Sequence, residues 1–325
     1  MPITFVNFPR HVEPAVYERA IEQVIEWLQE VDGIVSIYQV GSVSAPGISD
    51  IDLLAVFEDD AVVDGNPIAR LTGDERYLFT HGPFGVCRRD FHRGQRYTFY
   101  HNYTLRWGDD LRPADSDLGA DDVAGIKRQI ALEFLIANYI SKTVDRTYGL
   151  VSVRNVLLSV KALRYDMEYL GVTDGELYDL INQLIRWREA WFEQPIGKDR
   201  FEKWFDAFYA ALHLFLTAHL RRHRFFLPPW ASRRYARHIR LEKAQRLDWR
   251  RKGIVVPLGK RHLGKKYTKL HNRLNQFTFS VPATDQGSEV LEERFRFLKS
   301  MRRHNERHLA SFAPLGSVLA SRLVG

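Results

Sequence analysis

Residues 34–57 read IVSIYQVGSVSAPGISDIDLLAVF, and this stretch decides the fold that we expect for the N-terminal part of the chain. A run of apolar and β-branched residues ends at Gly41-Ser42, which indicates a strand followed by a turn. After a short connection, a second predicted strand carries Asp50 and Asp52 with one residue between them. Because residues i and i+2 of a strand point to the same face, the two carboxylates should project side by side.

Two neighbouring carboxylates at the end of an apolar strand repel each other, and a divalent cation removes this penalty. Mg²⁺ prefers carboxylate oxygens together with substrate phosphates as its ligands. The sequence therefore predicts that Asp50 and Asp52 bind a metal ion. The alternative interpretation is a turn and two surface aspartates before a strand.

The order of a Gly-Ser turn, a gap of several residues and Asp-x-Asp on a strand resembles the nucleotidyltransferase superfamily, the fold of DNA polymerase β. Gly41, Ser42, Asp50 and Asp52 match that pattern position by position, within residues 10–115 at most. The resemblance implies attack on the α-phosphorus of a nucleoside triphosphate, with release of pyrophosphate. It also implies that bound Mg²⁺ or Mn²⁺ holds the reacting oxygens in line. In such a site, Gly41 would let the backbone approach the phosphates, and Ser42 would offer them a hydroxyl and an N–H group.

The family usually has a third carboxylate on a later strand, and three residues are candidates for that position. Asp90 is the first choice, because it is the acid inside the strand-like segment 83–91. Asp109 and Asp110 follow the strand-like segment 97–107 and are the next candidates. If none of them serves, the chain would bind a nucleotide without turning it over efficiently. His81 precedes Gly-Pro, and we interpret it as a loop residue rather than as a contact to a phosphate or a base.

Composition favours an intracellular protein of two or three domains, with 325 residues of which 45% are hydrophobic. The single cysteine, Cys87, excludes disulfides and cysteine metal clusters and fits a reducing compartment. Residues 1–20 show no signal peptide, and the apolar segment 207–220 is too short to span a membrane. We therefore expect a cytoplasmic protein without a transmembrane segment.

Helical periodicity predicts an amphipathic helix over residues 12–31, and four further helices between residues 119 and 226. Four such helices make a bundle. Nucleotidyltransferases that act on small molecules often carry a helical domain after the catalytic sheet, so this architecture agrees with the resemblance. The expected fold class is α+β, with a nucleotidyltransferase-like mixed sheet and helices (1–118), a helical bundle (119–226) and a basic C-terminal region (227–325).

The positive charge is concentrated in residues 221–273, which hold 18 Lys and Arg against Glu242 and Asp248, although the whole chain has a net charge of only +7. We expect a helix over 231–252, a loop with a short hairpin or helix over 253–285, and a final helix over about 286–312. Basic residues interleaved with aromatics, such as Lys260, Lys266 and Tyr267, are typical of RNA binding. An anionic lipid surface, an acidic protein or a merely solvated surface are the alternatives.

One further pattern lies in the final predicted helix. Arg303 and His308 have the R-x4-H spacing of the ribonuclease motif of HEPN-type domains, which this segment resembles. Arg233 and His238 have the same spacing, so chance is the favoured explanation in a chain with 47 basic residues.

The functional hypothesis is a Mg²⁺-dependent nucleotidyltransferase that moves a nucleoside monophosphate, from ATP in the first instance, to a hydroxyl of a small molecule or a protein. The helical bundle favours such acceptors, whereas the basic segment favours an RNA 3′ end. A nucleotide- or RNA-binding protein with weak catalysis is the alternative from another class.

Overall fold

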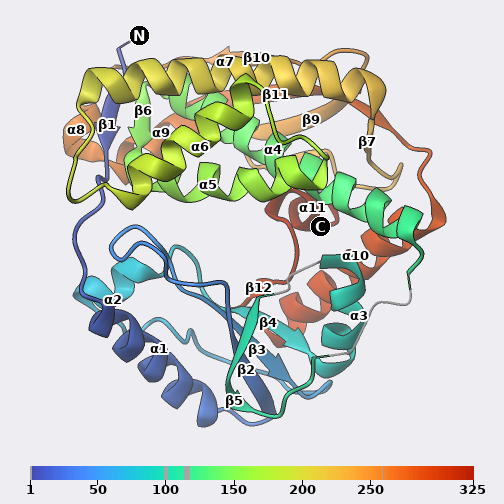
Figure 1. The fold of residues 1–325 in the computed structure, drawn as a ribbon. Coiled ribbons are helices and arrows are strands. Elements are labelled where there is room, and N and C mark those ends of the chain that lie inside the picture. The colour runs from blue at the N-terminus through green and yellow to red at the C-terminus, as the bar shows by residue number, and fades with distance from the viewer. Residues whose placement is uncertain (1, 99–101, 113–117, 258) are drawn as a thin grey trace. The chain divides into compact units, whose positions relative to one another are not determined.

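The computed structural model describes residues 2–98, 102–112, 118–257 and 259–325, and its helices and strands confirm a mixed α+β protein (Figure 1). The chain divides into two compact units. The sheet unit comprises Arg10–Val123, Glu293–Ser317 and Val324–Gly325. The helical unit comprises Met1–Pro9, Ala124–Glu292 and Val318–Leu323. This division differs from the three predicted domains, because the two units share the C-terminal region.

The sheet unit is built on a five-stranded mixed sheet with the strand order β12-β4-β3-β2-β5. The antiparallel strands β2 and β3 form its centre, and β5 adds to β2 in antiparallel orientation. Strands β4 and β12 continue the sheet in parallel with β3. The bounds are Ile34–Val40 (β2), Asp52–Phe57 (β3), Phe84–Cys87 (β4), Tyr103–Gly108 (β5) and Ala313–Pro314 (β12).

Helices cover both faces of this sheet. Because both faces of β3 are therefore buried, its sequence is an almost continuous apolar run. Helix α1 (Pro14–Gln29) packs its apolar stripe, which includes Ile21 and Val24, into one core with Ile37 of β2. Helix α3 (Arg88–Thr98) lies on the other face, where Phe91 stacks on Tyr38 with 5.5 Å between ring centroids. Ile37 and Tyr38 are neighbours in one strand and therefore point to opposite faces.

The C-terminal segment completes the sheet unit, although it is almost two hundred residues from β5 along the chain. Helix α10 (Glu289–His308) donates a hydrogen bond of 2.8 Å from Asn305 Nδ2 to the carbonyl oxygen of Gly85 in β4. The backbone N–H of Val63 donates to the carbonyl oxygen of His308 at 2.8 Å. A Cβ atom on Gly85 would lie 2.6 Å from the Cβ atom of Phe312, so this close approach requires glycine.

The helical unit contains the four helices that the sequence predicted for the bundle, and they are confirmed. They are α4 (Ala120–Tyr148), α5 (Val153–Tyr169), α6 (Glu176–Glu189) and α7 (Lys198–Arg222). Aromatic contacts join α6 and α7, where Trp187 and Trp204 have ring centroids 6.0 Å apart. Strand β1 (Thr4–Val6) pairs in parallel with β6 (Leu150–Ser152) in the same unit.

The predicted helix over residues 231–252 is wrong, because this segment forms strands. Buried Ile239 and Leu241 alternate with exposed Arg240, which is the period of a strand. The alternation is short and lies among many charged residues, so it could not be recognised in the sequence. The weak apolar stripe with helical spacing led to the wrong prediction of a helix. The strands are β7 (Phe225–Phe226), β8 (Arg234–Ala236), β9 (Ile239–Ala244), β10 (Asp248–Gly253) and β11 (Asn275–Thr284).

Shorter helices complete the described chain: α2 (Gly73–Leu78), α8 (Lys260–Leu263), α9 (Lys265–Leu274) and α11 (Val318–Leu323). Helices α8 and α9 occupy the segment that was expected to be mostly loop. Within the described ranges, no helix combines the length and the apolar character that crossing a membrane requires.

Candidate metal centre

The edge of the sheet where β2 ends and β3 begins brings the Gly-Ser turn to the carboxylate pair. Val40, the last residue of β2, pairs with Asp52, the first residue of β3. Gly41 and Ser42 therefore follow directly after the residue opposite Asp52. The Gly41 backbone has a φ of 74°, and no atom lies within 4 Å of the position that a Cβ would take. This space is what a backbone needs to approach a ligand closely.

The connection between Ser42 and Asp50 is held by two tyrosines from helices α1 and α2. The hydroxyl of Tyr17 donates to the carbonyl oxygen of Ser49 at 2.8 Å and accepts from the N–H of Gly47 at 2.9 Å. The hydroxyl of Tyr77 donates to the carbonyl oxygen of Gly47 at 2.8 Å. Because these hydrogen bonds hold the loop backbone at Gly47 and Ser49, the backbone directly before Asp50 is fixed.

His81 joins the two carboxylates, and the ligand atoms of Asp50, Asp52 and His81 all lie within 4.8 Å of one another. The Nδ1 atom of His81 lies 2.6 Å from the carbonyl oxygen of Gly82. A carbonyl oxygen only accepts, so this contact places a proton on Nδ1 and leaves Nε2 as the ligand atom of the neutral ring. Histidines that bind metals commonly donate their other ring N–H to such an acceptor.

The two carboxylates of the cluster differ in their contacts. Thr80 Oγ1 donates to Asp50 Oδ2 at 2.6 Å and thereby fixes the orientation of this carboxylate. The Oδ1 atom of Asp52 is buried and lies 3.1 Å from His81 Nε2, with which it forms an ion pair when the ring is protonated. When the ring is neutral, no described residue donates a hydrogen bond to this oxygen. A buried carboxylate oxygen in that state fits the ligand of a cation.

The electrostatics of the cluster also favour a cation. Burial, and then the charge of Asp52, raise the pKa of Asp50. Burial alone would lower the pKa of His81, but Asp52, the Gly82 carbonyl and Asp50 together raise it to about 9. The protonated ring is therefore the positive charge that balances the carboxylates in the protein without metal. A bound divalent cation would supply that charge instead.

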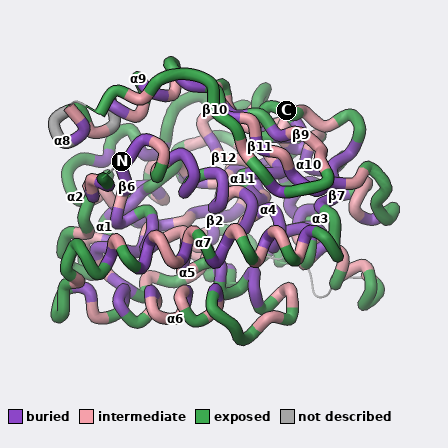
Figure 2. Tube along the Cα trace, turned by 90° about the horizontal axis from the view of Figure 1, so that it is seen from above, coloured by how far each residue is buried: buried purple, intermediate pink, exposed green. Residues whose placement is uncertain are grey.

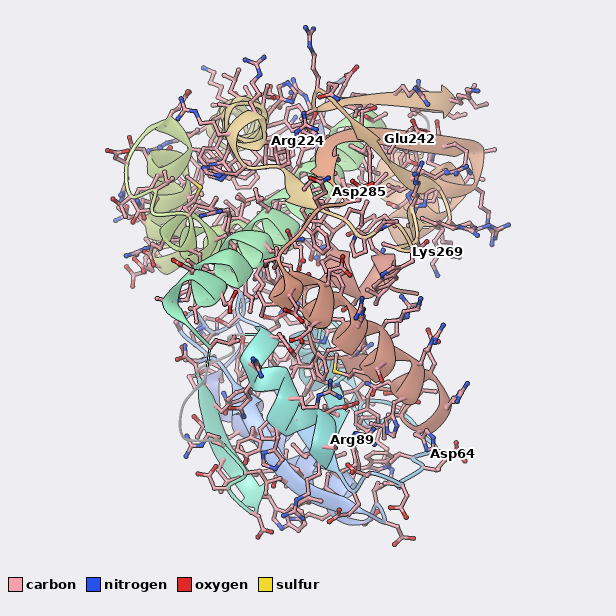
Figure 3. All side chains as sticks on the ribbon, turned by 90° about the vertical axis from the view of Figure 1, so that its right-hand side faces the viewer. Asp64, Arg89, Arg224, Glu242, Lys269 and Asp285 are labelled. Atoms are coloured by element: carbon pink, nitrogen blue, oxygen red, sulfur yellow. The ribbon has the colours of Figure 1, made fainter. Side chains whose placement is uncertain are left out.

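The structure does not bring Asp90 to this pair. Strand β4 ends at Cys87, and Asp90 lies in the first turn of α3, so the predicted strand over 83–91 is wrong beyond Cys87. Because β4 is parallel to β3 and Cys87 pairs with Phe57, Asp90 follows the far end of the strand that begins with Asp52. At ~3.3 Å per residue, the two ends of β3 are on the order of 17 Å apart. Asp90 is buried beside Arg89, whose Nε lies 3.4 Å from Asp90 Oδ1 (Figure 3 labels Arg89).

Asp109 and Asp110 also follow the far end of a strand, since Gly108 at the end of β5 pairs with Ser36. The carbonyl oxygen of Asp109 accepts a hydrogen bond of 3.1 Å from the hydroxyl of Tyr38. Arg112 Nε donates to Asp110 Oδ1 at 2.8 Å, and this guanidinium lowers the pKa of Asp110 to about 2. The segment expected as a strand over 97–107 begins later, because Tyr97 and Thr98 belong to α3 and residues 99–101 lie outside the described chain.

Gly41 and Ser42 differ in how their polar groups are engaged within the protein. The N–H of Gly41 donates to the carbonyl oxygen of Asn102 at 2.8 Å, whereas Ser42 is exposed. Of the Gly-Ser pair, Ser42 is therefore the residue that is placed to donate to a ligand. His81 was predicted to be a loop residue and not a member of the cluster. The signal for it was its position directly before the Gly-Pro that leads into β4.

The remaining candidate pattern lies on α10. His308 stacks on His304, with ring centroids 4.5 Å apart and an interplanar angle of 7°, so His308 is engaged with a neighbour on its own helix. No described contact connects the predicted R-x4-H pattern to the metal cluster.

No family model, no curated protein and no solved structure matches this chain.

Proposed function

We propose that this protein is a nucleotidyltransferase that depends on a divalent cation, Mg²⁺ or Mn²⁺. It would move a nucleoside monophosphate from a nucleoside triphosphate, such as ATP, to a hydroxyl of a small molecule or a protein. The observation that supports the proposal most is the cluster of Asp50, Asp52 and His81 beside the turn at Gly41 and Ser42. Possible ligands for a cation and an unobstructed approach to the Gly41 backbone lie at the same end of β2 and β3.

Each residue has a role that follows from its surroundings. Asp50 and Asp52 would hold the cation with their carboxylate oxygens, and His81 would add Nε2. Thr80 orients Asp50, and the Gly82 carbonyl oxygen orients His81. When bound, the cation would neutralise charge on the phosphate oxygens and align the reacting groups. The open space at Gly41 and the exposed Ser42 hydroxyl would serve the β- and γ-phosphates.

A second candidate function is nucleotide binding with weak catalysis. It is favoured by the positions of Asp90, Asp109 and Asp110. These residues follow the ends of β4 and β5 that lie away from Asp52. Without a carboxylate on the acceptor side, removal of a proton from the acceptor hydroxyl would be left to solvent. His81 could not serve as the base, because the cation would occupy Nε2 and Nδ1 is hydrogen-bonded to the Gly82 carbonyl oxygen.

The decisive experiment measures pyrophosphate release from ATP with Mg²⁺ or Mn²⁺, in the presence of a panel of hydroxyl acceptors. The double variant Asp50→Asn/Asp52→Asn removes both negative ligands at nearly constant size, and Asp109→Asn is the matched control at the other edge. We expect wild type to release pyrophosphate only with the cation. The double variant should release it at least about a hundredfold more slowly, and the control should keep the wild-type rate. Cation-dependent ATP binding without pyrophosphate release would establish the second candidate. No cation-dependent ATP binding at all would reject both.

A further inference from the structure

The register of the sheet in the helical unit aligns three arginines in one row. Arg234 of β8 pairs with Arg240 of β9, Arg240 pairs with Thr278 of β11, and Thr278 pairs with Arg250 of β10. Neighbouring strands lie about 4.8 Å apart, so the row spans roughly 14 Å. Paired residues of adjacent strands lie on the same face of a sheet. The three guanidinium groups therefore belong to one surface.

This surface is the outer face of the sheet. The residues that alternate with the arginine row are buried, namely Ile239 and Leu241 in β9 and Phe277 and Phe279 in β11. The ring of Phe279 contacts that of Tyr139 in α4, with centroids 6.1 Å apart, so the inner face packs on the helices. The arginines of the row are exposed, and Figure 2 colours β10 mostly as exposed.

The charge on this outer face is divided. Lys252 pairs with Gln276 and extends the arginine row at one end, whereas Glu242 and Asp248 both pair with Ser280 and lie at the other end. Glu242, labelled in Figure 3, forms an ion pair of 2.9 Å with Arg250. Within the described chain, Arg234, Arg240 and Lys252 form no ion pair. At least three cations are thus available to an anion.

The other side chains of this face decide which anion fits. Thr278 lies between Arg240 and Arg250, and Gln276 lies beside Lys252. Ser280 lies between the two acids, and all three side chains are polar and of small or medium size. A membrane surface would need apolar side chains to insert, and a protein interface would need an apolar centre. The phosphate backbone of a nucleic acid needs only cations and hydrogen-bond donors. Because the described residues of these strands present no exposed ring on this face, stacking on bases has no platform.

We propose that the outer face of β8, β9, β10 and β11 binds the sugar–phosphate backbone of a nucleic acid without reading its bases. This proposal is independent of the metal centre. It also relocates the contact that the sequence suggested for the segment around Lys260. That lysine is buried, and its Nζ donates to the carbonyl oxygen of Pro2 at 3.2 Å. The side chains of Arg261 and Lys265 lie outside the described part of the structure.

The test compares two triple variants of the full chain that lose the same charge. Arg234→Gln/Arg240→Gln/Lys252→Gln removes the cations of the sheet face. Arg221→Gln/Arg222→Gln/Lys269→Gln removes exposed cations of the same basic segment from α7 and α9 (Figure 3 labels Lys269). Affinity for labelled oligouridylate, and for its DNA counterpart, is measured by fluorescence anisotropy over a series of salt concentrations. Circular dichroism confirms that both variants are folded.

For single strands, the logarithm of affinity changes with the logarithm of salt concentration by a slope of about −0.7 per phosphate contact. We expect the sheet-face variant to flatten this slope by about 2, and the control variant to retain most of the wild-type slope. RNA and DNA should bind similarly, since neither the bases nor the 2′-hydroxyl are read. Equal effects of the two triple variants would overturn the assignment to this face. Wild-type binding that is weak and insensitive to salt would overturn the nucleic-acid proposal itself.

Discussion

His81 Nε2 lies 3.1 Å from Asp52 Oδ1, and this contact joins the segment that leads into β4 to the first residue of β3. The ring keeps its proton up to a pH of about 9, because the carboxylates outweigh the effect of burial on its pKa. A proton on Nε2 and a cation at the same atom exclude each other. The contact is therefore an ion pair in the absence of metal, and its two partners would become ligands of the proposed cation.

Replacement of the carboxylates should weaken metal binding directly. Asp50→Asn and Asp52→Asn each remove one negative charge from the cluster and leave its size almost unchanged. We expect each variant to lose at least about tenfold in affinity for Mn²⁺, and ATP affinity to lose its dependence on the cation. Isothermal titration calorimetry measures both quantities. Wild-type affinities in both variants would refute the metal centre.

The imidazole should make the site bind transition metals better than Mg²⁺, because nitrogen ligands suit Mn²⁺ and Zn²⁺ while Mg²⁺ prefers oxygen. His81→Gln should therefore reduce Mn²⁺ affinity more than Mg²⁺ affinity. Thr80→Val, which removes the hydrogen bond to Asp50, should reduce affinity for both ions by about ten- to a hundredfold. A competition titration with the two ions gives the ratio. If His81→Gln leaves that ratio unchanged, His81 does not bind the metal.

Asp90 should matter for stability and not for the metal centre. Asp90→Asn keeps the shape of the side chain but removes the charge beside Arg89 in a buried position. We expect a loss of about 1–3 kcal/mol in the free energy of unfolding, measured with urea. Mn²⁺ affinity should be unchanged, since Asp52 begins β3 and Asp90 follows the end of β4 that pairs with the other end of β3. Weaker metal binding by a fully folded Asp90→Asn protein would contradict the topology described above.

The packing of the C-terminal segment on the sheet can be tested at Gly85. A Cβ at this position would overlap the side chain of Phe312, so Gly85→Ala should cost about 1–3 kcal/mol of stability by overpacking. Gly125→Ala in α4 is the control, because nothing lies within 4 Å of its Cβ position. We expect that change to be neutral or stabilising, by up to about 1 kcal/mol. Equal stability of the two variants, by thermal unfolding, would show that Phe312 does not pack on β4.

The stability of the helical unit should fall at acidic pH through His219 on α7. Burial, followed by the charges of His223, Arg128 and Arg222, lowers the pKa of His219 to about 4. Between about pH 6.5 and pH 4, the unfolded chain binds a proton there that the folded chain does not, so stability decreases as the pH falls through this window.

His219→Gln should remove this part of the pH dependence. The variant should gain at most about 3 kcal/mol relative to wild type at pH 4, and no such gain at pH 8. Urea unfolding at the two pH values measures the difference. A gain of equal size at both pH values would mean that the substitution acts through packing rather than through protonation.

The sequence predicted the elements whose periodicity is long or whose signals are local. The four helices between residues 119 and 226 have repeated apolar stripes, and each was found. Strands β2 and β3, with the turn at Gly41 between them, were also found, because an apolar run that ends in glycine is a local pattern. The expectation that Asp50 and Asp52 share one strand is wrong for Asp50, because β3 begins only at Asp52. Their ligand atoms nevertheless lie within 4.8 Å of each other, as the spacing of two residues predicted.

Tertiary structure decided the features that depend on pairing between distant segments. The direction of β4 relative to β3 places His81 beside Asp52 and takes Asp90 to the opposite edge, and direction is not encoded in a single strand. The strands β8 to β10 have too few apolar residues to be recognised alone, and their register with β11 creates the row of Arg234, Arg240 and Arg250. The chain itself thus determined which residues could bind a cation or a phosphate. Folding decided which of them meet, because a contact between segments depends on the free energy of the whole packed sheet and not on local preference.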